Sequence, residues 1–213
     1  MPTVFSSQST EYVVERSRFI GQTFHFSDPE RLTSHLRPMM SKYPGANHYT
    51  WAYRLNESQE RASDNGEPRG TAGLPMLRVL TQEDWRETLV IVVRYFGGIK
   101  LGRGGLVHAY QKAAQLALQH TNPGSFRTIR TAQVQLDYGS YHRLRRPIEA
   151  LVLHSKSEFT ATVDLTLTLD EHHWFNLKDL LDQEARGQWT LIKSAHNVRL
   201  MPLNETQNES EER

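Results

Sequence analysis

The stretch that decides how this chain folds covers residues 88–106 and reads TLVIVVRYFGGIKLGRGGL. Its first nine residues are almost continuously apolar and β-branched, which is typical of a central β-strand covered on both faces. Five glycines follow, and the apolar positions after them recur at helical spacing as far as Ala117. The stretch therefore predicts a buried strand, then a glycine-rich turn, then a helix over about residues 105–120.

The residues before this stretch predict a mixture of strands and helices. The expected elements are extended structure over 11–26, a helix from Ser27 to Pro44-Gly45, a strand over 48–55 and a short helix over 74–81. Residues 56–73 are polar and punctuated by glycine, so we predict little regular structure there. The first ten residues are rich in Ser, Thr and Gln, and predict a frayed end.

A second rhythm of elements begins after the turn signal Asn-Pro-Gly at residues 122–124. The expected elements are a strand over 128–137, a helix over 139–152, a strand over 158–169, a helix over 170–185 and a strand over 188–200. With a short strand near 152–155 the order becomes βαββαβ, which is the ferredoxin-like plan. We therefore predict an α+β protein with a first domain over 1–125 and a ferredoxin-like second domain over 126–203.

Composition excludes several classes of protein. The chain has 213 residues, a formal net charge of +1 and no cysteine, which excludes disulfides, thiolate zinc sites and a cysteine nucleophile. No run approaches the roughly 18 apolar residues that span a bilayer, and no secretory leader is recognisable, so we expect a cytoplasmic protein without a membrane partner. The last ten residues, 204–213, are acidic and lack apolar side chains, which predicts a disordered tail.

Two other segments carry side chains suited to recognition. Residues 16–20 read RSRFI, and residues 63–75 read SDNGEPRGTAGLP. The residues that define the second segment are Asp64, Gly66, Glu67, Pro68, Gly70, Thr71 and Gly73. We predict a structural loop that is held by hydrogen bonds between the Asp and Thr side chains and the backbone. Two carboxylates three residues apart also suit surface recognition or acid–base chemistry, so these alternatives stay open.

The glycine-rich turn suggests a contact with phosphate. Successive exposed amides just before a helix bind anions, arginine and lysine add positive charge, and tyrosine can stack on an unpaired base. The residues expected at such a nucleic-acid or phosphate interface are Arg16, Arg18, Arg94, Tyr95, Gly97, Gly98, Lys100, Gly102, Arg103, Gly104 and Gly105. The alternative is a tight turn packed under a neighbouring loop, with ordinary surface charge. Neither the P-loop pattern nor the dinucleotide-binding glycine pattern is present.

Two clusters of basic and histidine residues in the second domain are interpreted as structural rather than functional. The basic cluster around Arg143, Arg145 and Arg146, with His142, spans more than one helix face and predicts solvated charge. The pair His172-His173 predicts a helix start rather than a metal site.

The order of the three segments and their amino-acid sequences resemble the motifs of the YigZ/IMPACT family. The strings D-x-G-E-P-x-G-T-A-G-x-P and R-Y-x-G-G-x-x-L-G-x-G-G-L are long and specific, and the resemblance covers residues 11–120. It implies a first domain like domain IV of elongation factor G, which is an α/β sandwich with a left-handed βαβ crossover, and a second domain like domain V of that factor. It also implies contact with nucleic acid or with components of translation.

We therefore expect an RNA- or ribosome-binding protein with a regulatory role in translation, whose partners are RNA or translation factors. No catalytic residue, metal or cofactor is predicted. Two alternatives stay open, namely a protein-interaction adaptor and an enzyme acting on a phosphorylated small molecule or nucleotide, with Asp64 or Glu67 as the base. A closed pocket where Asp64, Glu67 and Arg94 converge would favour the enzyme, whereas an open positive face would favour RNA.

Overall fold

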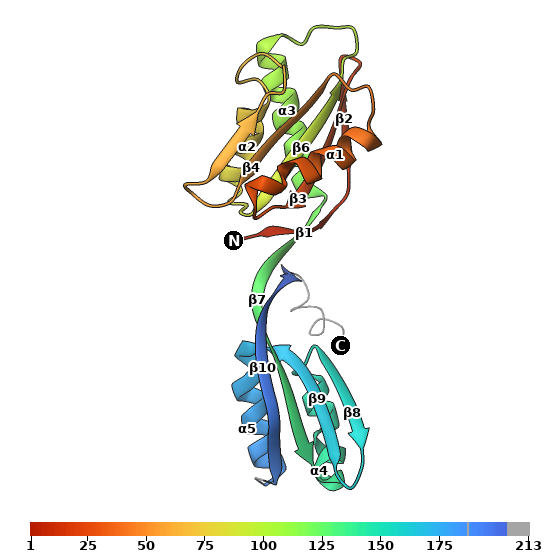
Figure 1. Cartoon of the computed structure of the whole chain (residues 1–213), viewed down its shortest axis with the longest axis vertical. Coiled ribbons are helices and arrows are strands. Elements are labelled where there is room, and N and C mark those ends of the chain that lie inside the picture. Colours follow the sequence, from red (N-terminus) through yellow and green to blue (C-terminus); the bar gives the residue numbers. More distant parts are fainter. Residues whose placement is uncertain (187, 204–213) are drawn as a thin grey trace, which may run out of the picture. The chain divides into compact units, whose positions relative to one another are not determined.

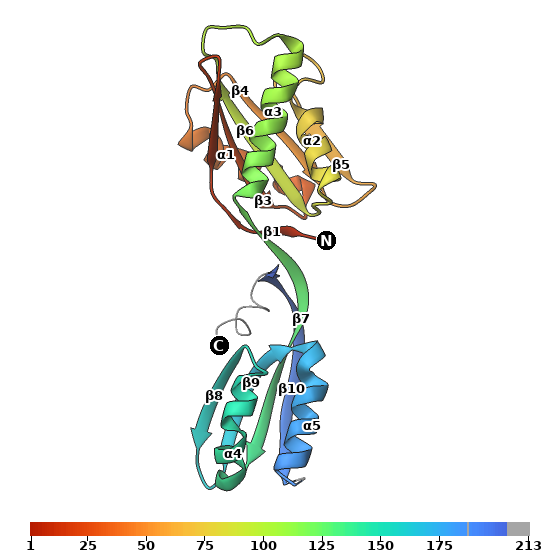
Figure 2. The same ribbon diagram turned by 180° about the vertical axis from the view of Figure 1, so that it is seen from behind.

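The computed structural model describes residues 1–186 and 188–203, so the tail predicted over 204–213 lies outside the described residues. Contacts between Cα atoms divide the chain into two units. The first unit comprises residues 1–125 together with 201–203, and the second comprises residues 126–200. Figures 1 and 2 show the ribbon from opposite sides.

A five-stranded sheet forms the centre of the first unit, with the order β2-β3-β6-β4-β5 and antiparallel neighbours throughout. Its strands are β2 (Thr10–Val14), β3 (Ser17–His25), β4 (His48–Arg54), β5 (Glu60–Ser63) and β6 (Thr88–Tyr95). Residues of β6 alternate between two cores, because Val90 and Val92 face one and Leu89, Ile91 and Val93 face the other. The prediction of a central strand covered on both faces is confirmed.

Helices cover both faces of this sheet (Figures 1 and 2). One face carries the short turn η1 (Pro29–Arg31) and α1 (Leu32–Lys42), and the other carries α2 (Gly73–Gln82) and α3 (Gly102–Gln119). Met39 of α1 is buried in one core, whereas Met76 of α2 and Tyr110 of α3 are buried in the other.

Three local predictions for the first unit were wrong. The first ten residues are not frayed, because β1 (Thr3–Ser7) pairs with residues 121–124, a contact across the chain that local composition does not signal. Strand β5 lies in the stretch expected to be irregular, and its polar sequence suits an edge strand that pairs with β4 alone. Helix α3 begins at Gly102, so Gly104 and Gly105 belong to its first turn.

The second unit has the predicted element order βαββαβ. Its elements are β7 (Thr121–Leu136, which begins in the first unit), α4 (Tyr138–Glu149), β8 (His154–Phe159), β9 (Val163–Asp170), η2 (Glu171–His173), α5 (Trp174–Glu184) and β10 (Trp189–Pro202). The strand order is β10-β7-β9-β8, and α4 and α5 lie on one face (Figure 2). Leu144 of α4 and Leu177 of α5 pack with Leu165 and Leu167 of β9 in its core.

Two strand boundaries in this part of the chain differ from the predictions. Strand β7 already begins at Thr121, where a turn was expected, and Pro123 pairs with Val4 beside a register irregularity. A strand end beside such an irregularity tolerates the missing N–H of proline. The strand predicted over 158–169 is divided by the β8–β9 turn. In the described residues, no helix is both long enough and apolar enough to cross a membrane.

Candidate nucleic-acid interface

Three segments that are far apart in the sequence meet at one end of the first unit. They are the β2–β3 turn, the loop between β5 and α2, and the connection from β6 to α3. The hydroxyl oxygen of Ser17 accepts hydrogen bonds from the backbone N of Gly97 at 3.2 Å and from Nη2 of Arg94 at 3.4 Å. Arg103 Nη2 donates to the carbonyl oxygen of Arg69 at 2.9 Å. The structure thus brings together the three segments singled out from the sequence.

A buried ion pair lies beneath this junction. Arg94 Nη1 donates to Glu67 Oε1 at 2.6 Å, and the Tyr110 hydroxyl donates to the same oxygen at 2.7 Å. Burial and this hydrogen bond both raise the pKa of Tyr110, so the phenol stays protonated and remains a donor. The guanidinium carbon of Arg94 also lies 5.3 Å and 5.6 Å from the ring centroids of Phe19 and Phe96. Arg94 and Glu67 are therefore engaged inside the unit.

Asp64 organises the loop between β5 and α2. Its carboxylate accepts hydrogen bonds from the backbone N atoms of Gly70 at 2.8 Å, Ala72 at 3.0 Å and Gly73 at 2.9 Å. Partial burial acts to raise the pKa of this carboxyl, but the three N–H groups and the charge of Arg69 outweigh it and hold the pKa below its ordinary value. The carboxylate is thus bonded to the backbone of its own loop.

Other residues of the motif hold the same loop in shape. Thr71 Oγ1 donates to the carbonyl oxygen of Pro68 at 2.6 Å. Gly66 and Gly70 have φ angles of +85° and +78°, in the left-handed region that favours glycine. The backbone of β5 approaches Gly73 so closely that a Cβ atom there would come within 2.8 Å of it. The loop therefore has the structural hydrogen bonds that its sequence predicts.

The two carboxylates of this loop do not share a partner. Asp64 faces backbone amides, whereas Glu67 faces Arg94. His48 donates from Nδ1 to the carbonyl oxygen of Asn65 at 2.8 Å, and its Nε2 lies 3.8 Å from Glu67 Oε1. In the described part of the chain, no three His, Cys, Asp or Glu side chains are grouped to hold a metal ion.

The glycines after β6 are present for different reasons. Gly97 packs against the backbone of the β2–β3 turn, where a Cβ atom would come within 2.0 Å of the carbonyl carbon of Arg16. Gly98 and Gly102 have φ angles of +86° and +69°. The last two glycines of the motif lie in the first turn of α3, and neither has a positive φ. The backbone therefore requires glycine at three of the five positions.

The surface above the buried ion pair is basic. Four exposed cations lie in the three segments of this junction, and we define them together as the cationic rim: Arg16, Arg69, Lys100 and Arg103. Glu15, beside Arg16 in the β2–β3 turn, is also exposed. Asp64 and Glu67 of the neighbouring loop bond to backbone amides and to the buried Arg94, and the charge of the half-buried Asp64 also acts on Arg69.

Three of the predicted interface residues are turned to other partners. Arg18 makes two hydrogen bonds of 3.0 Å to Glu11, and its guanidinium carbon lies 5.5 Å from the ring centroid of Tyr95. Tyr95 is half-buried and donates its hydroxyl to the carbonyl oxygen of Pro44 at 3.1 Å. Arg94 is buried. The rim therefore depends on the other cations of the motifs.

Sequence reasoning missed the roles of three residues at this junction. Ser17 lies between two arginines without any signal of its own, and Tyr110 is recognisable only as a core position of its helix. Phe96 occupies the variable position of R-Y-x-G-G, and the residue is 45% exposed in the folded protein. Only the tertiary contacts assign these roles.

Comparison with known proteins identifies the family of this chain. The family model for the Impact N-terminal domain matches residues 15–118. The IMPACT family member YvyE of Bacillus subtilis is 32% identical, and the match covers 87% of this chain and 87% of that protein. The chain belongs to the IMPACT family. An IMPACT family member of Haemophilus influenzae is 34% identical and is matched over 84% of this chain and 89% of its own length.

A solved structure extends the likeness to both units. The crystal structure of a hypothetical protein is 26% identical, covers 96% of this chain and 97% of its own, and superposes with a TM-score of 0.57. This likeness supports the mixed α/β fold class over almost the whole chain. The matched IMPACT family region, 15–118, contains all three segments that form the junction.

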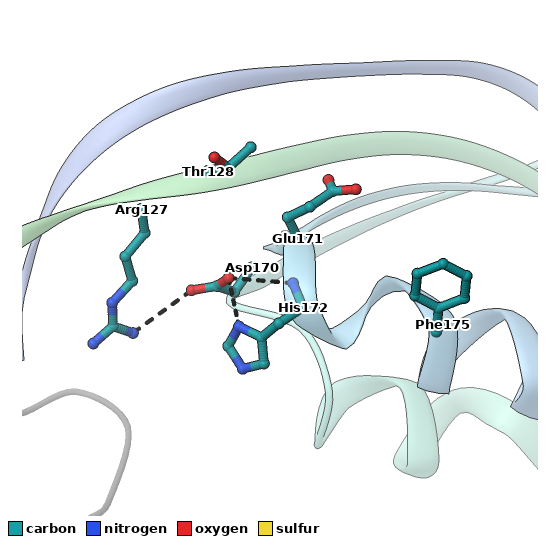
Figure 3. Close-up of a pocket in the computed structure, with 6 residues that line it drawn as sticks. All are labelled: Arg127, Thr128, Asp170, Glu171, His172 and Phe175. Atoms are coloured by element: carbon teal, nitrogen blue, oxygen red, sulfur yellow. Dashed lines mark hydrogen bonds and ion pairs between the residues drawn. The ribbon is translucent and has the colours of Figure 1, made fainter.

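A depression in the second unit lies outside that matched region (Figure 3). Its volume is about 580 Å³, and it is lined by Arg127, Thr128, Asp170, Glu171, His172 and Phe175. Asp170 Oδ1 accepts from the backbone N of His172 at 3.4 Å and contacts its ring Nδ1 at 2.6 Å. Arg127 Nη1 lies 3.7 Å from Asp170 Oδ2. His172 therefore belongs to a helix start, as the sequence predicts.

The basic residues of α4 face solvent, as predicted. Arg145 forms an ion pair of 3.0 Å with Glu149 one helical turn away, and Arg143 donates to the carbonyl oxygen of Glu184 at 3.1 Å. Arg146 is exposed.

Proposed function

We propose that this protein binds RNA through the cationic rim and thereby acts in the regulation of translation. The observation that carries the proposal is the separation of charge at the junction. The cations are exposed around glycine backbone, whereas Asp64 and Glu67 are bonded inward. Exposed arginine and lysine side chains suit phosphate groups.

The physical basis of this binding is local. The chain has a net charge of only +1, so attraction for RNA must come from the clustered rim rather than from the field of the whole protein. Backbone N–H groups at the start of α3, an 18-residue helix, add partial positive charge at the same place.

The role in translation is proposed because the chain belongs to the IMPACT family. Members of the IMPACT family are expected to contact translation components, so ribosomal RNA in the cytoplasm is the proposed ligand. The strand order β10-β7-β9-β8 supports a ferredoxin-like second domain, and the α1–sheet–α2/α3 layers support a sandwich like domain IV of elongation factor G. The enzyme alternative has less support, because Asp64 and Glu67 already have partners.

The test is the salt dependence of RNA binding by the full chain, measured by fluorescence anisotropy with labelled fragments of ribosomal RNA. Each phosphate contact adds about 0.7 to 0.9 to the slope of log affinity against log salt. Lys100→Ala combined with Arg103→Ala should therefore lower the slope by about 1.4 to 1.8. The matched control removes two exposed arginines elsewhere, with Arg37→Ala in α1 and Arg78→Ala in α2, and should leave the slope unchanged.

Thermal unfolding of each variant must first establish that it is folded. Absence of RNA association at about 50 mM salt would contradict the proposal. So would a folded double variant that keeps the full slope. Either result would favour the adaptor or the enzyme.

A further inference from the structure

We infer that the ring of Phe96 is a stacking platform for an unpaired nucleobase, which makes single-stranded RNA the preferred ligand of the cationic rim. This inference rests on the function proposed above and adds the class of RNA. Tyr95, the residue expected from the sequence to stack on a base, is half-buried and bonded to Pro44. Its neighbour Phe96 projects at the surface instead and is 45% exposed.

Exposure by itself is no evidence, because single apolar side chains on protein surfaces are common. What distinguishes Phe96 is the fixed backbone on which it stands. Its backbone N donates to Asn47 Oδ1 at 2.8 Å, and the N of the next residue, Gly97, donates to Ser17 Oγ at 3.2 Å. The β2–β3 turn also packs directly against Gly97. A base that stacks on such a preorganised ring meets little cost in conformational entropy.

One face of the Phe96 ring packs against a side chain that is itself held in place. The guanidinium carbon of Arg94 lies 5.6 Å from the ring centroid, and the ion pair with Glu67 at 2.6 Å holds the guanidinium in place. Arg94 therefore lies over one face of the Phe96 ring, and the residue as a whole is 45% exposed to solvent. An aromatic ring supported from below by a cation is suited to a flat π-system above it.

Exposed cations accompany Phe96 along the same connection, and they would contact the phosphates next to a stacked base. Lys100 and Arg103 follow Phe96 along the same connection and the start of α3, and the backbone of Arg16 packs against the neighbouring Gly97. Aromatic platforms between cations are typical of proteins that bind single strands. A duplex keeps its bases stacked inside the helix, so it cannot offer one to this ring.

The experiment uses the full chain and three labelled probes of about 12 nucleotides: single-stranded oligoadenylate, a duplex, and an abasic strand with the same phosphates. Wild-type protein should bind oligoadenylate about tenfold more tightly than the abasic strand. Phe96→Leu keeps an apolar cover over Arg94 but removes the ring, so it should lose that preference. Its salt slope should stay unchanged, because stacking displaces no counterions.

Phe5 provides the matched control. It is also 45% exposed, and it lies on β1, at the end of the first unit away from the start of α3 (Figures 1 and 2). Phe5→Leu should leave the preference for bases intact. Phe96→Trp keeps a ring and adds a fifth tryptophan, so the fluorescence that the variant gains over wild type should be quenched by oligoadenylate and not by the abasic strand.

The outcomes separate this inference from the function on which it rests. The stacking platform is wrong if Phe96→Leu keeps the preference for bases, or if the fluorescence of Phe96→Trp does not respond. In that case, a lower salt slope in the rim double variant would still support RNA binding. If wild-type protein binds none of the probes and no ribosomal RNA, both proposals fail together.

Discussion

The two glycine-rich segments of the first unit resemble each other in composition but direct their polar groups oppositely. In the loop between β5 and α2, the side chains of Asp64 and Glu67 face inward onto backbone amides and onto Arg94. In the connection from β6 to α3, Lys100 and Arg103 face solvent. A glycine-rich segment is therefore not by itself a sign of a binding surface. Here the loop between β5 and α2 supports the surface, and the connection from β6 to α3 carries its exposed cations. Stability separates the two roles, because only substitutions of the supporting residues should lower it strongly.

The largest loss of stability is expected for Glu67→Ala. Arg94 is only 5% exposed, and the substitution leaves its guanidinium without the carboxylate partner. An uncompensated buried charge costs about 3–5 kcal/mol. Urea denaturation measures the change in the free energy of unfolding. Glu83→Ala removes an exposed acid at the end of α2 and should change stability by about 0.5 kcal/mol or less. Equal effects of the two substitutions would refute the supporting role of the loop.

The next effect is expected for Gly97→Ala. The added Cβ would lie 2.0 Å from backbone atoms of the β2–β3 turn, which cannot be relieved by rotating a side chain. Steric overpacking of this kind costs about 1–3 kcal/mol or more. Gly104→Ala is the control, since a Cβ atom there would meet open space and alanine is favoured in a helix. Thermal melts should show a lower midpoint for the first variant alone.

Asp64→Asn should have a smaller effect that depends on pH. Losing charge-assisted hydrogen bonds to the loop backbone should lower stability by about 1–2 kcal/mol at neutral pH. The folded pKa of Asp64 is lowered, so its contribution is complete above the unfolded value of about 3.9 and is lost as pH falls through the folded pKa. The difference in stability between the two proteins, measured by urea titration, should therefore begin to shrink as pH falls below about 4. A difference that stays constant with pH would contradict the charged role.

The smallest effect on stability is expected for the rim. Lys100 is exposed, and Arg103 contributes one exposed hydrogen bond to the Arg69 carbonyl, so the double alanine variant should lose about 1 kcal/mol or less. The same variant should show the lowered salt slope of RNA binding. A loss as large as that of Glu67→Ala would mean that the connection is structural as well, and the contrast between the two segments would disappear.

Elements with local signals could be predicted from the order of residues alone. The apolar run of β6, the helical periodicity of α3 and the βαββαβ order of the second unit are properties of neighbouring residues, and they predict those elements directly. The long motifs likewise indicated the family, which the relatives confirm. Capping of the helix start at His172 by Asp170 is also a local interaction.

The burial or exposure of each motif residue, in contrast, was set by tertiary packing. Arg94 meets Glu67 across 27 residues of sequence and Ser17 across 77, so its burial depends on how strands and loops pack. Strand β1 forms its ladder with residues 121–124, which are far from it in the sequence. Tyr95, the last residue of β6, packs partly against one core of the sheet, whereas Phe96 follows the end of the strand and is exposed. Contacts between distant residues fix these choices, and no local pattern encodes them.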